Sequence, residues 1–166
     1  MNRKFLLGSE WLYIKIYGGP KILEHILINE IYELNNSLSL DFVDKFFFIR
    51  YYDDDGNHLR LRYHIKDARK TLGEILFKIN NCLSLYIEKN LLAKITFETY
   101  SREIERYGSE NIEDVETLFS CESSLIILII KKLDLNDGIF LEEKRWLYCV
   151  YLIDFILSKF LLSIDD

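Results

Sequence analysis

The segment that most constrains the fold is residues 46–62, in which two strand-like runs flank a polar turn. The runs are 46–51 (FFFIRY) and 58–62 (HLRLR), and the intervening residues 53–57 (DDDGN) contain an Asp-Gly and a Gly-Asn step. Such steps supply the positive φ angles that a tight turn between two strands requires. The sequence therefore predicts a β-hairpin over this segment.

The second strand of the hairpin gathers its basic side chains on one face. Successive side chains of a strand point to opposite sides of the sheet. One side therefore carries four apolar or aromatic residues, Leu59, Leu61, Tyr63 and Ile65. The other side carries a basic row, His58, Arg60, Arg62 and His64. Neighbouring positive charges repel each other, so this row is tolerable if it faces solvent or if it holds an anion.

The composition limits the kinds of partner that this row can have. The chain has 166 residues, 49% of them hydrophobic, which suits a single globular domain over residues 1–166. Its formal net charge of −6 disfavours non-specific binding to nucleic acid, so a local basic patch points to a specific small anion. Three scattered cysteines, with neither a signal peptide nor a membrane-spanning helix expected, indicate a cytoplasmic protein with reduced thiols.

Hydrophobic periodicity predicts the remaining elements. Together with the hairpin they give the order β-α-β-β-α-β followed by two helices, an α+β chain of the ferredoxin-like, split βαβ type. Alternating residues predict strands over 11–17 and 93–100. Apolar residues at helical spacing predict helices over 20–34, 68–89, 111–133 and 141–164.

This topology predicts a second, functional face of the sheet. Its first and third strands are central neighbours, so Trp11 and Lys15 should lie beside the basic row, while helices cover the opposite face. Solvated strands favour Thr, Lys and Glu rather than Trp, Tyr, Phe and Arg together, so we expect a binding face. The residues expected on it are Trp11, Tyr13, Lys15, Phe48, Arg50, His58, Arg60, Arg62, Thr96, Glu98 and Tyr100.

A second cluster of charged residues follows the last predicted strand, in residues 100–108 (YSREIERYG). Because that strand leaves the same sheet, Glu103 and Arg106 can return over the functional face, together with Tyr107. A carboxylate beside guanidinium groups stays ionised. The arrangement would place a base next to an anion site, as proton abstraction beside a carbonyl requires.

These motifs, taken in order, resemble the C-terminal domain of lantibiotic dehydratases, which also occurs as a stand-alone thiopeptide-type bacteriocin biosynthesis protein. The resemblance covers about residues 10–133, and the C-terminal helix in 134–166 is short relative to the family. The motifs are W-x-Y-x-K at 11–15, F-F-x-R-Y at 47–51, H-L-R-x-R at 58–62, E-x-x-R-Y-G at 103–108, and Leu118-Phe119 followed by Ser123-Ser124.

The resemblance implies a lyase. Family members eliminate glutamate from glutamylated Ser or Thr of a precursor peptide and leave dehydroalanine or dehydrobutyrine. The arginines would hold the glutamyl carboxylates and the developing enolate, since guanidinium groups bind carboxylates through two hydrogen bonds. The implied catalytic residues are Arg60, Arg62, Glu103 and Arg106. The expected substrate-binding residues are Arg50, His58, Lys15, Trp11, Tyr13 and Tyr107.

The implied partners are the precursor peptide, with its leader and core, and a glutamylating dehydratase subunit. The predicted helix 141–164 is apolar nearly all round, which favours burial in a homo- or hetero-oligomer. We expect no direct contact with nucleic acid. No cofactor is expected either, because His58 and His64 would lie about 20 Å apart along one strand and no phosphate-binding glycine loop is present.

One departure from the family affects the mechanism. Eliminating members use a further histidine near their C-terminus, whereas the last histidine here is His64. Three explanations stay open: a second polypeptide completes the site, the chain is a truncated domain, or it only binds peptide as a scaffold. A ring-forming cycloaddition, as in thiopeptide biosynthesis, is an alternative activity. An RNA-binding sheet face is disfavoured by the acidic net charge.

Overall fold

The computed structural model of the chain describes residues 2–38, 41–134 and 141–159. They fall into two compact units, Met1–Ile127 and Leu128–Asp166, and the boundary lies within helix α5 (Ile112–Asp134). Helix α6 (Leu141–Lys159) belongs to the second unit, and the last part of the helix predicted over 141–164 lies outside the described residues. No helix among the described residues is long and apolar enough to cross a membrane.

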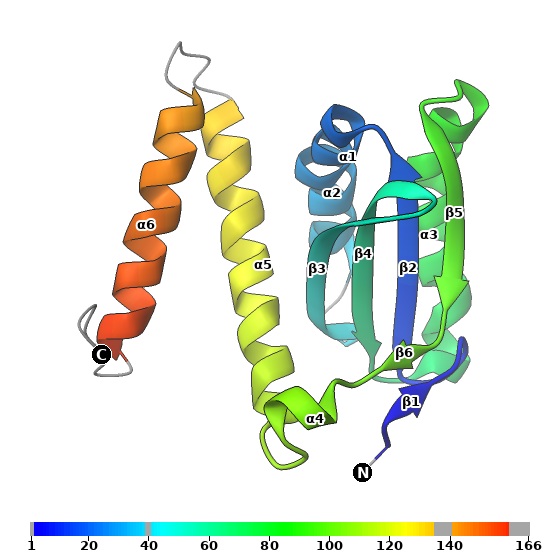
Figure 1. Cartoon of the computed structure of the whole chain (residues 1–166). Helices are drawn as coiled ribbons and strands as arrows, with labels where there is room; N and C mark the ends of the chain where they lie inside the picture. Colours follow the sequence, from blue (N-terminus) through cyan, green and yellow to red (C-terminus); the bar gives the residue numbers. More distant parts are fainter. Residues whose placement is uncertain (1, 39–40, 135–140, 160–166) are drawn as a thin grey trace. The chain divides into compact units, whose positions relative to one another are not determined.

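The centre of the first unit is a four-stranded antiparallel sheet with the order β3-β4-β2-β5 (Figure 1). The predicted order of strands and helices is confirmed, and so is the central pairing of the first and third predicted strands. Trp11 lies opposite His64 and Lys15 opposite Arg60. The strands are β2 (Trp11–Gly18), β3 (Val43–Asp53), β4 (Gly56–Ile65) and β5 (Leu92–Glu98).

The hairpin between β3 and β4 closes more tightly than the predicted loop 53–57. Asp53 pairs with Gly56, so only Asp54 and Asp55 form the turn. Gly56 has a φ of +107°, a backbone conformation that side-chain-bearing residues rarely adopt. Gly56 therefore allows a turn of only two residues, so the pairing of β3 with β4 starts directly at Asp53 and Gly56.

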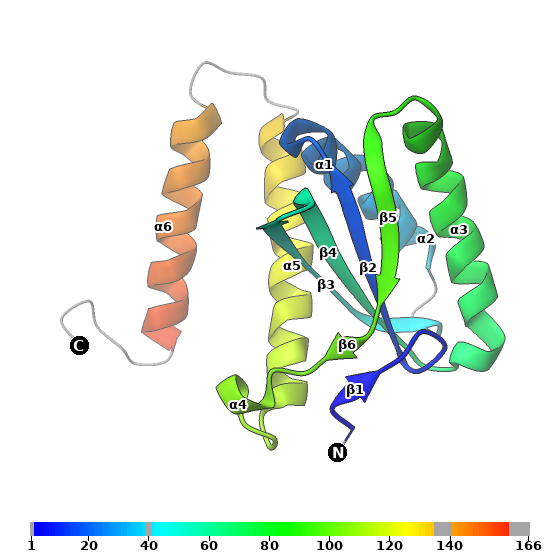
Figure 2. The same ribbon diagram turned by 45° about the vertical axis from the view of Figure 1, so that its right-hand side comes forward.

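Helices cover one face of this sheet (Figure 2). Pro20 begins the first helical segment, where its fixed φ and missing N–H cost nothing. The main apolar core lies beneath the helices and includes Leu12, Ile14, Leu59 and Leu61. The helices are α1 (Pro20–Ile26), the π-helical turn η1 (Leu27–Ile31), α2 (Tyr32–Ser37) and α3 (Ala68–Glu88).

The register of the hairpin corrects the predicted position of two residues. Residues opposite each other in an antiparallel pair share a face. Phe48 lies opposite Leu61, and Arg50 opposite Leu59, so both are on the helix-covered face rather than on the functional face. There Arg50 forms an ion pair of 2.8 Å with Glu24 of α1. The prediction failed because the face of a β3 residue depends on the length of the turn, which the sequence pattern left undefined.

Aromatic side chains form a second core on the opposite face. Trp11 and Phe5 are fully buried in this aromatic cluster. A two-stranded sheet, β1 (Lys4–Phe5) with β6 (Tyr100–Ser101), helps to form it and was not predicted. The members of the aromatic cluster are Phe5, Trp11, Tyr13, Phe47 and Tyr100, with Phe119 of α5 packed against them.

Helix α5 also protects the outer edge of β3. The hydroxyl oxygens of Ser120 and Ser123 accept hydrogen bonds of 3.1 Å from the backbone N–H groups of Phe46 and Phe48, respectively. Because strand neighbours alternate in direction, these N–H groups point away from β4 and would otherwise lack a ladder partner. The two serines therefore replace a fifth strand.

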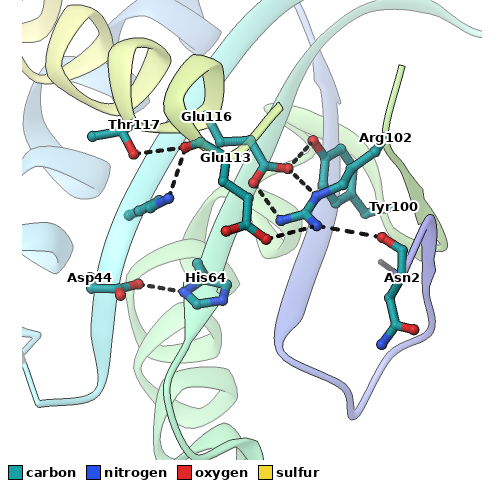
Figure 3. A network of polar contacts seen from close by, with 9 residues as sticks. Asn2, Asp44, His64, Tyr100, Arg102, Glu113, Glu116 and Thr117 are labelled. Carbon is teal, nitrogen blue, oxygen red and sulfur yellow. Dashed lines mark hydrogen bonds and ion pairs between the residues drawn. The ribbon is translucent and has the colours of Figure 1, made fainter. Parts of the chain in front are cut away.

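A buried ion pair joins α5 to Arg102, the residue that directly follows β6 (Figure 3). Arg102 donates from Nε and Nη2 to the two carboxylate oxygens of Glu116, each at 2.7 Å, and the Tyr100 hydroxyl donates to the same carboxylate at 2.9 Å. Burial alone lowers the pKa of Arg102, but the hydrogen bonds and charge of Glu116 outweigh it and raise that pKa. Arg102 therefore keeps its positive charge in this buried position.

Replacing Glu116 with Gln should destabilise the protein by about 3–5 kcal/mol, because Arg102 would keep its charge in a buried site without a counter-charge. Urea denaturation followed by circular dichroism measures this loss. The matched control is Glu113→Gln, since that exposed carboxylate lies 3.4 Å from Arg102 and contributes well under about 1 kcal/mol. Equal stabilities of the two variants would contradict the structural role of Glu116.

Candidate functional site

The uncovered part of the sheet carries the predicted polar residues on its two central strands. Tyr13 lies opposite Arg62, Lys15 opposite Arg60, and Tyr17 opposite His58. We call the face formed by Tyr13, Lys15, His58, Arg60 and Arg62 the basic face. Because side chains alternate along a strand, these residues form two neighbouring rows on the same face, one on β2 and one on β4.

Arg62 is buried on this face, and no carboxylate among the described residues forms an ion pair with it. Its side chain is enclosed by aromatic rings, with Cζ 4.7 Å from the ring centre of Tyr13, 5.2 Å from Phe47 and 5.3 Å from Tyr100. Its Nε and Nη1 atoms are buried and make no hydrogen bond to the described residues. Burial lowers the pKa of Arg62, and Glu103 is near enough for its carboxylate to act in the opposite direction.

We call the three rings of Tyr13, Phe47 and Tyr100 around Arg62 the Arg62 cage. The free energy of burying the Arg62 charge in this cage favours an anionic ligand. A buried unpaired charge costs several kcal/mol even after the protein relaxes. Each cation–π contact returns roughly 0.5–2 kcal/mol, so the three rings offset a substantial share of this cost, but they leave the buried Nε and Nη1 atoms without a hydrogen-bond acceptor among the described residues. A carboxylate that reaches Arg62 would supply the missing interaction.

Arg60 is held beside Arg62 in a different way. Its Nε donates a hydrogen bond of 3.1 Å to Nε2 of His58, and its Cζ lies 3.5 Å from the ring centre of Tyr51. Its side chain is only partly buried. Arg60 therefore offers an accessible, oriented cation next to the enclosed one.

Lys15 brings one carboxylate onto the basic face. Its Nζ lies 2.8 Å from Oε1 of Glu98 on β5, and Glu98 lies opposite Tyr13 in the sheet. Burial lowers the pKa of Lys15, but the hydrogen bond to Glu98 and the nearby Glu98, Tyr13 and Tyr17 together outweigh this effect, and the pKa is raised. Lys15 is thus a fixed cation whose charge is already compensated, unlike Arg62.

Of the predicted residues in the segment after β6, Glu103 has an electrostatic influence on Arg62, and it is the smallest of those that affect the pKa of this arginine. Glu103 precedes the short helix α4 (Ile104–Tyr107). Arg106 is exposed, 3.7 Å from Glu103, and no contact joins it to Arg60 or Arg62 among the described residues. Tyr107 packs edge-on against Phe119, which in turn contacts Phe47 of the Arg62 cage.

Two predicted substrate-binding residues lie elsewhere. Trp11 has no exposed surface and belongs to the aromatic cluster, where its ring packs 5.0 Å from that of Tyr100. Arg50 is on the opposite face with Glu24. Both are therefore corrected to structural positions: Trp11 because Tyr100 and Phe47 cover it, and Arg50 because of the strand register.

Sequence reasoning missed two residues that complete the site, Phe47 and Tyr51, whereas Tyr100 was expected on the functional face and lies against Arg62. The signal for Phe47 and Tyr51 was the hairpin turn: closing it at Asp53 and Gly56 places Phe47 opposite Arg62. Tyr100 is brought in by β6, whose pairing with β1 leaves no periodic signal. No group of three or more His, Cys, Asp or Glu that could hold a metal occurs among the described residues.

Comparisons with known proteins agree with this geometry. The family "Lantibiotic biosynthesis dehydratase C-term" matches residues 11–166. The chain is 32% identical over 130 residues to the subtilin biosynthesis protein SpaB of Bacillus subtilis and 27% identical over 126 residues to the nisin biosynthesis protein NisB of Lactococcus lactis subsp. lactis. These matches cover 78% and 75% of this chain but 12% of each relative.

A solved structure supports the same assignment. The crystal structure of the tRNA-dependent lantibiotic dehydratase MibB from Microbispora sp. 107891 matches with a TM-score of 0.69 and 30% identity, over 79% of this chain and 12% of that one. The chain thus spans about an eighth of the length of the proteins that it matches. Because the family model matches residues 11–166 and the fold matches that of a solved dehydratase, the chain belongs to the family of lantibiotic dehydratase C-terminal domains.

Proposed function

We propose that this chain eliminates glutamate from glutamylated Ser or Thr residues of a precursor peptide during the biosynthesis of a modified bacteriocin. The observation that carries the proposal is the basic face, where Arg62 is buried with Nε and Nη1 unbonded to any described residue, beside the oriented guanidinium of Arg60. Such a pair suits the free carboxylate of a glutamyl ester. The proposal rests also on the family to which the chain belongs.

The reaction needs a base, an electrostatic stabiliser and a leaving group. The base removes the proton from Cα of the modified residue, and the electron pair moves toward the neighbouring carbonyl as an enolate. The Cβ–O bond to the ester then breaks. The peptide keeps a dehydroalanine or dehydrobutyrine, and glutamate leaves with the electron pair on its carboxylate.

We assign these tasks to residues around the basic face. Arg62 and Arg60 would hold the glutamyl carboxylate and stabilise the enolate, since donors that are already in place need no reorganisation during the reaction. Glu103, exposed and near Arg62, would act as the base. Arg106 would orient Glu103, while Lys15, Tyr13 and Tyr107 would line the path of the peptide.

The proposed partners follow from the same reaction. The substrate is the core of a precursor peptide that carries its leader, and a glutamylating dehydratase subunit supplies the ester. The chain matches only 12% of each relative, so the proposed glutamylation is assigned to a separate subunit rather than to this chain. We propose that the chain works in a homo- or hetero-oligomeric assembly with such a subunit, in the cytoplasm.

A second candidate is a peptide-binding scaffold without catalysis. It is favoured by two histidines near the basic face that are already engaged: His64 is paired with Asp44, and His58 has both ring nitrogens bonded to protein atoms. Under this reading the basic face would bind the acidic glutamylated peptide without processing it. Elimination measured with the purified chain, alone and with the glutamylating subunit, separates the two functions.

Replacing Arg62 with Lys should lower elimination at least about 100-fold, because Lys keeps the charge but cannot form the two-pronged contact with a carboxylate. Mass spectrometry of the peptide should show glutamylated intermediate accumulating. Arg50→Lys is the matched control and should leave elimination unchanged, since Arg50 lies on the helix-covered face with Glu24. Unchanged dehydration by the Arg62 variant would refute the assignment of this residue.

Replacing Glu103 with Gln should reduce the elimination rate by about 100- to 10,000-fold, the usual contribution of a general base. Binding of the glutamylated peptide should persist, because the arginines remain. Glu105→Gln provides the control: that carboxylate is exposed and pairs with Arg3 at 2.7 Å. If both variants eliminate glutamate at the same rate as the parent chain, another group is the base.

A further inference from the structure

His58 is enclosed within the hairpin rather than presented to a ligand. Only 1% of its surface is exposed. Its ring lies between two tyrosines, with ring centres 4.5 Å from Tyr17 on β2 and 5.6 Å from Tyr51 on β3. A substrate cannot contact the ring without displacing the Tyr17, Tyr51 or Arg60 side chain, so we look for a role of His58 that acts through a neighbour.

The hydrogen bonds of His58 fix its tautomer. The Nε–H group of Arg60 can only donate, so Nε2 of His58 must accept that bond of 3.1 Å and carry no proton. The proton of the neutral ring is then on Nδ1, which donates to the carbonyl oxygen of Gly56 at 3.1 Å. This is the geometry of a ring that serves as an acceptor for arginine.

The hairpin turn supports this tautomer from the other side. Oδ1 of Asp53 lies 3.7 Å from Nδ1 of His58, where a negative charge favours a protonated nitrogen. The Asp53 carboxylate is held in place by the hydroxyl of Tyr17 and the backbone N–H of Asp55, each at 3.1 Å. The turn residues therefore determine which nitrogen of His58 faces Arg60.

These contacts determine which edge of the Arg60 guanidinium can bind a ligand. With Nε engaged by His58 and one guanidinium face stacked on Tyr51, the end that carries Nη1 and Nη2 is what remains for a ligand. A carboxylate can bind that end through two parallel hydrogen bonds. An Arg60 free of His58 could instead rotate and offer its Nε edge.

We propose that His58 is a positioning residue, a neutral Nδ1–H imidazole that orients Arg60 so that it binds a carboxylate ligand end-on through its two terminal nitrogens. The geometry of His58 and Arg60 stands by itself, whereas the identity of the carboxylate as that of a glutamyl ester rests on the proposed function. Direct contact of His58 with the peptide, expected from the sequence, is replaced by this indirect role.

Nuclear magnetic resonance of the free, ¹⁵N-labelled chain tests the geometry without any substrate. Long-range ¹H–¹⁵N correlations distinguish the two neutral tautomers, and we expect His58 in the Nδ1–H form, with a slowly exchanging Nε–H signal for Arg60. An Nε2–H tautomer, or an Arg60 signal that exchanges as fast as that of an exposed arginine, would overturn the proposal.

A matched pair of variants then separates positioning from packing. In His58→Gln the side-chain oxygen can take the place of Nε2 and accept from Arg60, whereas in His58→Asn the shorter amide can reach Gly56 but not Arg60. We expect protection of the Arg60 Nε–H in the Gln variant and its loss in the Asn variant, at similar melting temperatures. Equal Arg60 protection in both variants would contradict the role of His58.

The same pair links the geometry to the reaction. We expect His58→Gln to keep elimination within about threefold of the parent chain and His58→Asn to lower it at least tenfold, at peptide concentrations that saturate both. Equal activities despite different Arg60 protection would show that end-on orientation is irrelevant to the ligand. A parent chain that neither binds nor processes the glutamylated peptide would refute the proposed function, while the resonance measurements would still decide the position of Arg60.

Discussion

The register of the β3–β4 hairpin is the constraint on which the rest of the site depends. Because the turn closes between Asp53 and Gly56, Phe47, Ile49 and Tyr51 share a face with Arg62, Arg60 and His58. A turn longer by one residue would exchange the faces of β3, since side chains alternate along a strand. Arg62 would then lose one ring of its cage, and Arg60 the tyrosine on which it stacks.

This register gives the two neighbouring arginines different environments. Arg62 is enclosed and forms no ion pair within the described part of the chain, so its interaction with an anion is strengthened by the low polarity around it. Arg60 is partly exposed and held by a neutral histidine and a ring. On the basic face, Arg62 thus provides a strong local electric field, and Arg60 provides a guanidinium of fixed orientation. Lys15 adds no uncompensated charge, because it is paired with Glu98.

The sequence predicted the order of elements and the neighbours of Lys15 because strand alternation, helical spacing and a glycine-containing turn are local signals. It failed where the answer depended on distant contacts. The burial of Trp11 comes from Tyr100 and Phe47, and the pairing of Arg102 with Glu116 joins a loop to a helix. The face of Arg50 required the turn length, and β1 with β6 were too short to show periodicity.

The serine contacts of α5 have a consequence for how this chain associates with others. Ser120 and Ser123 occupy N–H groups on the outer side of β3, which an added strand would need for its ladder. Strand exchange or edge-to-edge aggregation of the four-stranded sheet is therefore blocked on that side by two hydroxyl groups. Any growth of this sheet by an extended peptide is directed to its other border, along β5.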